Sequence, residues 1–438
     1  MKFYDRKEEI KLLERSLEHS RNESRMTVLM GRRRIGKTEL SLRCSDETIL
    51  YFFVAKKTEA LLCQDFVAEI KEKTDTPLLG NVTSFAEVFK FVLQLSAIRP
   101  LTLVIDEFQN FLKVNPSIFG DIQRDWDLNH NSSHLNLIIS GSVFTLMKKI
   151  FEDYQEPLFG RANELIKLHP FSTQVLKEIL SDFNPHYSNE DLLTLFSITG
   201  GIPWYVSLLL DNGNTSKAAM LKYLTNDNSP FINEGRNILI EEFGSDYITY
   251  FSILTCIASG MRTRAEIEGE LNSTNIGSYL TRLERYYDLV TKTLPINSKP
   301  SSKKVRYQLN DCFLILWFRF FYKFQSLVEN RAMRSLATII ERDFDSAAGF
   351  MLERYFTRKF EEEGKYIVGK WWDRKGHNEI DLIIIDPLDN EVWFYEVKVN
   401  PQKYNLQLLQ EKVKLMLEAN PAFKKMKSHL GCLSIEDM

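Results

Sequence analysis

The chain has 438 residues, of which 44% are hydrophobic and 26% are charged, ordinary values for a folded globular protein. This composition excludes a chain that is mostly disordered, collagen-like or of low complexity. The 56 basic and 59 acidic residues leave a formal net charge of −3, which excludes a uniformly cationic nucleic-acid coat but not a local basic surface. At roughly 100–200 residues per domain, this length predicts two to four domains.

Cysteine usage and hydropathy favour a cytoplasmic protein. Five scattered cysteines form no pattern with zinc-ligand spacing, which is typical of reduced thiols. The charged N-terminal segment, MKFYDRKEEIKLLER, lacks the apolar core of a signal peptide. The most apolar run, Cys312–Phe321, has about half the length needed to cross a bilayer and contains Arg319. We therefore expect this run to be a buried helix, with no membrane contact.

Residues 1–170 alternate strand-like and helix-like segments. The strand-like segments are short, apolar runs of β-forming residues: Met26–Met30, Ile49–Ala55, Leu101–Ile105 and Leu135–Ser140. Such runs are typical of strands buried on both faces of a parallel sheet. The amphipathic stretches Thr58–Thr74 and Ser84–Ile98 lie between them, so we expect an α/β domain. The following residues, 171–244, lack strand signals and predict a helical lid.

A phosphate-binding loop is the clearest motif in the chain. Gly31–Thr38 reads GRRRIGKT, which satisfies G-x-x-x-x-G-K-[ST], and it lies between a predicted strand and a predicted helix. In such loops the backbone N–H groups surround phosphates, and the N-terminus of the helix adds positive potential. We expect Lys37 to reach the β- and γ-phosphates and Thr38 to bind Mg²⁺. The predicted nucleotide-binding residues of this segment are Gly31, Arg32, Arg33, Arg34, Ile35, Gly36, Lys37, Thr38 and Glu39.

Acidic residues follow the strand LTLVI. We expect Asp106 to hold the magnesium shell and Glu107 to orient or deprotonate the attacking water. An acidic loop without this role is the alternative. Ser140 and Ser142 end the strand LNLIIS, where parallel sheets face their ligands, and either could sense the γ-phosphate. A plain turn explains the two serines as well.

Five motifs in this order resemble the archaeal-type ATPases of the AAA+/STAND P-loop group: GRRRIGKT, VIDEFQ, ISGS, PLFGR and TGGIPWY. The resemblance covers about residues 1–240 and implies a central sheet ordered 5-1-4-3-2 with ATP as the nucleotide. It implies that Arg161 is an arginine sensor or finger. Arg161 could act on the nucleotide of its own chain, or on that of a neighbouring chain in an oligomer. A surface ion pair is the alternative. It also implies that Pro203 lies near the adenine, although a helix-capping turn explains the same residues.

Residues 245–310 predict a winged helix-turn-helix. Three expected helices, Tyr247–Ser259, Arg264–Leu271 and Asn275–Tyr287, precede two short strands that flank a turn-rich segment. Between Gly260 and Asn310 the chain has five acidic and nine basic residues, the latter being Arg262, Arg264, Arg282, Arg285, Lys292, Lys299, Lys303, Lys304 and Arg306. Ser273, Thr274 and Asn275 could touch DNA at the start of the third helix, and the wing SKPSSKK suits a phosphate backbone. Duplex DNA is therefore the expected partner, with packing against the ATPase as the alternative.

The C-terminal residues contain a second group of chemically suggestive side chains. Residues 346–438 are expected to form a helix, three strands, a helix and a strand. Glu396 and Lys398 are two apart on one strand, so they point to one face, and a hairpin can bring Asp381 beside them. Glu353 lies on the preceding helix. These carboxylates would hold Mg²⁺ or Mn²⁺, and Lys398 would position a water or stabilise developing charge.

This order of elements and residues resembles the PD-(D/E)XK nuclease superfamily, although Ile380 stands where the naming motif has proline. The resemblance covers roughly residues 346–438 and implies Glu353, Asp381 and Glu396 as metal ligands and Lys398 as the catalytic lysine. The alternative is that Glu396 and Lys398 form an ion pair that protects an edge strand.

The predicted fold class is α/β. We expect a parallel-sheet P-loop ATPase core (1–170), a helical lid (171–244), a winged helix-turn-helix (245–310), connecting helices (311–345) and an α/β nuclease-like domain (346–438). The predicted function is ATP hydrolysis coupled to a DNA-binding winged helix and a metal-dependent nuclease domain. The alternatives are a nucleotide-gated signalling or scaffold ATPase with a non-catalytic C-terminal module, and a DNA-binding regulator that uses the wing alone.

Overall fold

The computed structural model describes residues 1–43, 48–76, 80, 82–243, 247–273, 275–299 and 301–438. The chain divides into two compact units: Asp5–His169 form one, and Met1–Tyr4 with Pro170–Met438 form the other. The described cysteines Cys63, Cys256, Cys312 and Cys432 are free thiols, and Cys44 lies outside the described residues. No helix in the described ranges is both long and apolar enough to cross a membrane.

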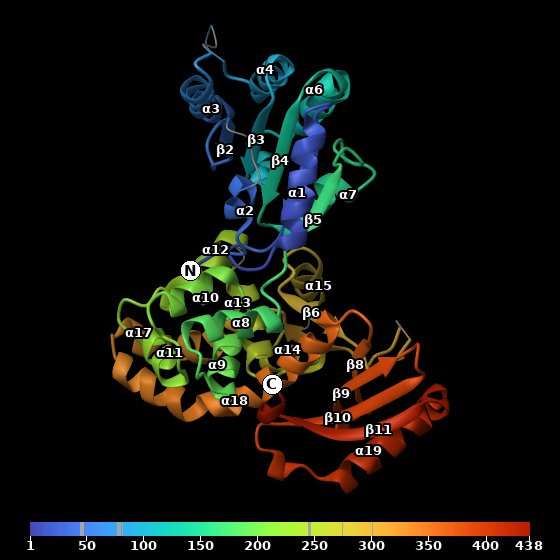
Figure 1. Cartoon of the computed structure of the whole chain (residues 1–438). Helices are drawn as coiled ribbons and strands as arrows, with labels where there is room; N and C mark the ends of the chain where they lie inside the picture. The colour runs from blue at the N-terminus through green and yellow to red at the C-terminus, as the bar shows by residue number, and fades with distance from the viewer. Residues whose placement is uncertain (44–47, 77–79, 81, 244–246, 274, 300) are drawn as a thin grey trace. The chain divides into compact units, whose positions relative to one another are not determined.

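The unit Asp5–His169 is built around a five-stranded parallel sheet in the order β2-β3-β4-β1-β5 (Figure 1). Its strands are β1 (Arg25–Met30), β2 (Ile49–Phe53), β3 (Leu101–Asp106), β4 (Leu135–Gly141) and β5 (Glu164–Lys167). The expected order 5-1-4-3-2 is confirmed, as are the four predicted strands. The fifth, β5, is an edge strand of four residues with only Ile166 buried, so it shows no continuous apolar run.

Helices cover both faces of this sheet (Figure 1). They are α1 (Lys7–Ser20), α2 (Lys37–Arg43), α3 (Glu59–Thr74), α4 (Phe85–Ile98), α5 (Phe111–Val114), α6 (Ile118–Asn129) and α7 (Phe144–Glu152). Strand residues such as Val28 and Leu103 share one buried core with apolar side chains of α3, α4, α6 and α7. On the opposite face of β1, the hydroxyl of Thr27 is 2.9 Å from that of Ser16 on α1.

In the second unit, the described residues 171–243 form a run of helices without a strand, as predicted. These helices are α8 (Thr173–Phe183), α9 (Asn189–Thr199), α10 (Pro203–Leu210), α11 (Lys217–Leu224) and α12 (Phe231–Phe243). Three further helices and an antiparallel hairpin then follow, in the predicted order: α13 (Tyr247–Ala258), α14 (Arg264–Glu270), α15 (Gly277–Arg285), β6 (Val290–Thr293) and β7 (Arg306–Leu309).

The apolar run Cys312–Phe321 is a buried helical segment, as predicted. It comprises α16 (Cys312–Leu316) and most of a π-helical turn (Trp317–Tyr322), and among its ten residues only Arg319 is not buried. After α17 (Gln325–Glu329), α18 (Met333–Glu362) runs without interruption for 30 residues. The boundary expected at 345/346 therefore falls inside one helix, and the finer division into five parts stays a prediction.

Helix α18 is anchored to the start of its unit through Arg358. The guanidinium donates hydrogen bonds to the carbonyls of Gly200 at 2.6 Å, Pro170 at 3.0 Å and Phe171, and it pairs with Glu362 at 2.7 Å. One side chain thus satisfies three backbone carbonyls from two loops. Because carbonyls without partners are costly when shielded from water, Arg358 stabilises the packing of α18.

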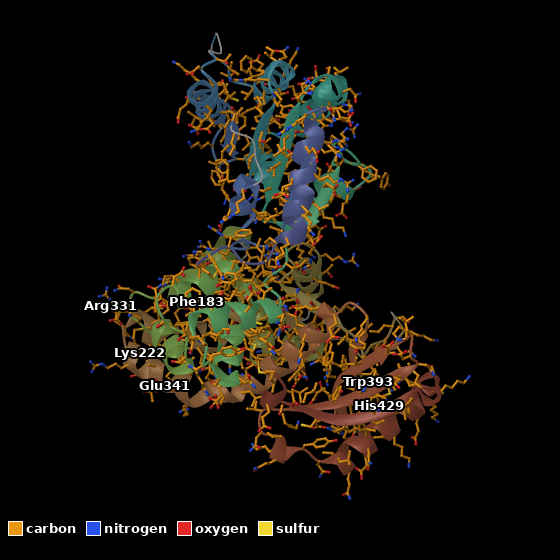
Figure 2. All side chains as sticks on the ribbon, in the orientation of Figure 1. Phe183, Lys222, Arg331, Glu341, Trp393 and His429 are labelled. Carbon is orange, nitrogen blue, oxygen red and sulfur yellow. The ribbon has the colours of Figure 1, made fainter. Side chains whose placement is uncertain are left out.

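The C-terminal residues form a four-stranded sheet in the order β11-β10-β9-β8 (Figure 1). Its elements are β8 (Ile367–Trp372), β9 (Glu379–Asp386), β10 (Glu391–Lys398), α19 (Leu406–Ala419) and β11 (Lys427–Ser434). Figure 2 shows Trp393 and His429 side by side, and their stacked rings come from paired positions of β10 and β11, with centroids 5.3 Å apart. Strand β10 lies between β9 and β11, and it pairs with β11 along its whole length through Lys398, so the edge-strand interpretation of Glu396 and Lys398 is wrong.

Candidate functional site

The phosphate loop connects β1 to α2 in the strand-loop-helix arrangement that the motif requires. Arg34 and Gly36 take positive φ values of 70° and 91°, and a Cβ at Gly31 would meet the Leu168 carbonyl oxygen at 3.0 Å. The buried Lys37 ammonium donates to the carbonyls of Gly31 at 2.9 Å and Arg32 at 3.0 Å. The loop is therefore tightly folded, with its lysine held inside it.

Asp106 lies at the centre of a hydrogen-bond network at the carboxyl end of β3. Its carboxylate accepts from the hydroxyls of Thr38 and Tyr51, each at 2.8 Å, and from the hydroxyl of Ser140. Burial works to raise the pKa of Asp106, but the hydrogen bonds from Ser140, Tyr51 and Thr38 outweigh it and lower that pKa. The two predicted magnesium-shell residues, Thr38 and Asp106, are thus in contact. Tyr51 is a partner that the sequence analysis did not identify.

Glu107 is held separately from its neighbour Asp106. Its backbone is left-handed, with φ 55°, and its carboxylate accepts from the Ser142 hydroxyl at 2.7 Å and from the Gln109 amide. The two serines of ISGS therefore bind different carboxylates. Gln109 was not predicted as a site residue, although it lies in the VIDEFQ motif that carried the family resemblance.

Burial dominates the electrostatics of the loop lysine. It lowers the pKa of Lys37, while the carboxylates of Glu107 and Asp106 act in the opposite direction and the cation of Arg33 adds to the lowering. A buried ammonium next to two carboxylates and a turn of backbone N–H groups is an arrangement that suits a polyphosphate bound to a divalent cation.

Arg161 and Pro203 have structural partners of their own. The Arg161 guanidinium forms a two-pronged ion pair with Asp127 of α6, at 3.0 Å and 2.8 Å. Pro203 is the first residue of α10, and Gly200, with φ 55°, ends α9 in the left-handed conformation. These contacts match the ion-pair and helix-capping alternatives, so the roles of Arg161 as a finger and of Pro203 at the adenine stay predictions.

In the C-terminal sheet, β9 and β10 bring three of the predicted residues together. Asp381 Oδ2 accepts a hydrogen bond from the Val397 N–H at 2.9 Å and lies 3.7 Å from Lys398 Nζ. Lys398 Nζ lies 2.9 Å from Glu396 Oε1. Glu353 of α18 is close enough for its charge to act on both Asp381 and Lys398.

Two lysines that the sequence analysis did not identify complete this cluster. Lys412 of α19 is 3.2 Å and 3.1 Å from the two carboxylate oxygens of Glu396, and Lys370 of β8 is 2.7 Å from Glu353 Oε2. Lys412 precedes the buried Val413, a position from which a lysine can bury its stem while its ammonium reaches a partner. The C-terminal cluster therefore consists of Glu353, Asp381, Glu396, Lys370, Lys398 and Lys412.

The carboxyl groups of this cluster titrate differently. Burial, followed by the nearby charge of Glu353, raises the pKa of Asp381 to about 6. Burial also works to raise the pKa of Glu396, but hydrogen bonds from Lys398 and Lys412 outweigh it and lower that pKa. In the part of the chain that the structure describes, no three His, Cys, Asp or Glu side chains are grouped so as to hold a metal ion. Lysine ammonium groups instead contact all three carboxylates.

The basic residues of 245–310 do not form one free surface. Arg262 and Arg306 both pair with Glu379 of β9, at 3.2 Å and 2.8 Å. In the turn between β6 and β7, the Ile296 N–H donates to the Lys370 carbonyl at 2.8 Å, and its side chain packs against the core of the C-terminal sheet. This side of the hairpin is a packing surface. Lys292, Lys299 and Lys303 are exposed, as is Asn275, while Thr274 lies outside the described residues.

Comparison with known proteins gives matches to both ends of the chain. Residues 3–209 match the family described as "ATPase domain predominantly from Archaea", and residues 317–408 match "Archaea bacterial proteins of unknown function". An uncharacterized protein of Methanocaldococcus jannaschii is 28% identical over 409 residues, which cover 90% of this chain and 87% of that protein.

Two solved structures resemble the fold. The Walker-type ATPase of Pyrococcus abyssi has a TM-score of 0.53 at 21% identity and covers 72% of this chain and 96% of its own. The ORC2 protein of Aeropyrum pernix, in ADPNP–ADP complexes, has a TM-score of 0.51 at 14% identity. The match covers 76% of this chain and 96% of the ORC2 chain. Taken with the phosphate loop and the parallel sheet, the match over residues 3–209 identifies this part of the chain as a P-loop ATPase domain.

Proposed function

We propose that the chain binds ATP with Mg²⁺ at the phosphate loop and hydrolyses it. The observation that carries this proposal is the contact between Thr38 and Asp106 at 2.8 Å, next to a separately oriented Glu107. The hydroxyl and the ionised carboxylate are hard oxygen donors of the kind that Mg²⁺ prefers. The ORC2 relative is described in complexes with ADPNP and ADP, which supports the choice of nucleotide.

In this proposal each residue has one task. Thr38 and Asp106 would hold Mg²⁺, which on binding neutralises charge on the β- and γ-phosphates. Lys37 would turn from the loop carbonyls toward those phosphates. Glu107 would orient the attacking water and accept its proton, and Ser142 and Gln109 keep its carboxylate in one position.

The experiment compares steady-state ATP hydrolysis and ATP binding in Glu107→Gln and in the control Glu72→Gln, an exposed carboxylate on α3. Glu107→Gln is expected to retain ATP binding and to slow hydrolysis by at least about a hundredfold, the usual scale for a lost general base. The control is expected to behave as the wild type. Hydrolysis by Glu107→Gln at the wild-type rate would show that another residue activates the water.

For the C-terminal cluster we propose a metal-dependent nuclease site. Lys398 lies within salt-bridge distance of both Asp381 and Glu396, the three residues come from two interior strands, and Glu353 approaches from α18. The lysine–carboxylate pairs imply that metal binding must displace ammonium groups from Glu353 and Glu396, so we expect weak, millimolar affinity. The competing proposal is a scaffold, in which these ion pairs only stabilise the sheet.

Mn²⁺ titration of the full chain and cleavage of plasmid DNA separate the two proposals. Lys398→Ala is expected to keep Mn²⁺ binding and to lose cleavage, because the lysine acts on the reacting phosphate rather than on the metal. The control Lys427→Ala removes an exposed lysine that pairs with Glu391, and it should change neither property. Absence of Mn²⁺ binding at millimolar concentration in the wild type would favour the scaffold.

We propose only limited DNA contact for residues 245–310. The packing of Ile296 and the pairing of Arg262 and Arg306 with Glu379 support the packing alternative for one side of the hairpin. The exposed Lys299 and Lys303 support a contact with phosphates at the tip of the turn.

A further inference from the structure

A cavity of about 190 Å³ lies inside the second unit, where α13, β7 and α18 meet β8 and the start of β9. Its charged lining consists of Arg262, Arg306, Arg319, Lys370 and Glu379. It is separate from the phosphate loop, which belongs to the other unit. The cavity shares Lys370 with the C-terminal cluster, but Asp381, Glu396 and Lys398 do not line it.

The charge of the lining is not balanced. Arg262 and Arg306 share a single carboxylate, Glu379, and Lys370 pairs with Glu353. The hydrogen bond described for Arg319 goes to the neutral hydroxyl of Ser346 at 2.7 Å. The lining itself therefore holds four cationic side chains and one carboxylate, and outside the lining the charges of Glu266 and Asp343 act on Arg306 and Arg319.

The cationic groups are also well positioned to donate. The Arg306 guanidinium lies over the Trp372 ring at 4.3 Å from its centroid, and its side chain is only 13% exposed. A guanidinium stacked on a ring keeps its edge N–H groups in its own plane, parallel to the ring. These groups match the oxygens of a phosphate. The site therefore has a fixed donor rather than a mobile surface lysine.

The remaining walls are partly apolar and partly neutral and polar, the polar residues being Ser259, Thr293, Tyr307 and Gln308. Leu309 and Met351 are buried, and Ile257, Ile315 and Phe350 line the same cavity. A bare inorganic anion would leave these walls in contact with water, whereas an organic group would cover them. The volume is below the roughly 300–1,000 Å³ of sites for drug-sized ligands, so the ligand must be small.

We propose that this cavity binds a small organic phosphate with a single-ring organic group, with its phosphate on Arg262, Arg306 and Arg319 and its organic group against Phe350 and Met351. The combination of a cationic end and an apolar wall in one small cavity is the observation that selects this class. A phosphate of a nucleic-acid backbone has the same charge, but it would bring a polymer that the small volume does not accommodate.

The test is calorimetric titration of the full chain with phenyl phosphate, whose single ring supplies the organic group. All proteins carry Lys37→Ala, so that the phosphate loop does not contribute the signal. Saturable binding is expected, tighter for this probe than for inorganic phosphate. Arg319→Gln and Arg262→Gln should each weaken it by about tenfold, the scale of one charge-assisted hydrogen bond. The control Arg334→Gln removes the same charge from an exposed position of α18 and should leave the affinity unchanged.

Three results would overturn the proposal. The first is no saturable binding, and the second is binding that neither Arg319→Gln nor Arg262→Gln weakens. The third is arginine-dependent binding of a short oligonucleotide without binding of phenyl phosphate, which would make the cavity a nucleic-acid subsite. Thermal melting of each variant checks folding. If Arg319→Gln is unstable, Arg262→Gln decides the outcome, because this side chain is 40% exposed and Glu379 keeps Arg306 as a partner.

Discussion

Replacing Asp381 by asparagine should stabilise the protein above pH 6. The amide oxygen of asparagine can still accept the Val397 N–H, so the change removes the buried charge but not the hydrogen bond. The pKa of Asp381 is about 6, against 3.8 for an unperturbed aspartate. At about 1.4 kcal/mol for each unit of pKa, ionising Asp381 costs the folded state about 3 kcal/mol.

The sign of the pH dependence follows from this raised pKa. Below about pH 4, Asp381 is protonated in both the folded and the unfolded chain, so it does not lower the free energy of unfolding. As the pH rises to about 6, the unfolded chain loses this proton more easily, and the wild type becomes less stable. The asparagine variant does not ionise, so its advantage should grow over the same interval. It should reach about 3 kcal/mol at pH 7, a value that already includes the attraction between Asp381 and Lys398, because that attraction contributes to the pKa of about 6.

Urea denaturation at several pH values from 4.5 to 7.5 measures this difference, with tryptophan fluorescence as the signal, since Trp371 and Trp372 are buried in the same sheet. The control is Asp389→Asn, an exposed turn residue whose replacement should have no pH-dependent effect. A difference between wild type and Asp381→Asn that stays constant over this pH range would refute the reasoning. So would a variant that is less stable than the wild type at pH 7.5.

Three further changes test other parts of the structure. Arg358→Met removes the donors of three carbonyls, so it should lower stability by about 3 kcal/mol, measured as a lower urea midpoint; an unchanged midpoint would contradict this anchoring role. Tyr51→Phe removes one partner of Asp106 and should raise the Mg²⁺ concentration for half-maximal ATP hydrolysis by at least about tenfold, whereas an unchanged Mg²⁺ dependence would rule out that supporting role. Reversing Lys303 and Lys304 to Glu should weaken duplex DNA binding and lower its salt slope by about 0.9 for each phosphate that the protein no longer neutralises; unchanged binding would leave the hairpin a packing element.

The ATPase core shows how far sequence patterns extend. The four predicted strands were predictable because each is a run of apolar β-formers; β1, β3 and β4 are almost wholly buried, whereas β2, at the edge of the sheet, buries only Leu50 and Phe52. The contact between Thr38 and Asp106 was predictable because the carboxyl ends of parallel strands and the phosphate loop meet at one edge. Strand β5 was not predicted from residue patterns, because an edge strand of four residues needs no apolar run. Only the family resemblance implied its place in the sheet.

The C-terminal sheet marks the limit of those patterns. Alternation along β10 placed Glu396 and Lys398 on one face, but it could not show that β11, more than 25 residues later in the chain, would make β10 an interior strand. The alternation also could not show that Lys412 would reach Glu396. Nor could it show that Arg262 and Arg306 would form ion pairs with Glu379 and so be unavailable to a basic DNA-binding surface. Local periodicity is set by interactions within a few residues, and the sequence alone determines it. Ion-pair partners and strand neighbours depend on which distant segments pack together, so only the tertiary structure decided them.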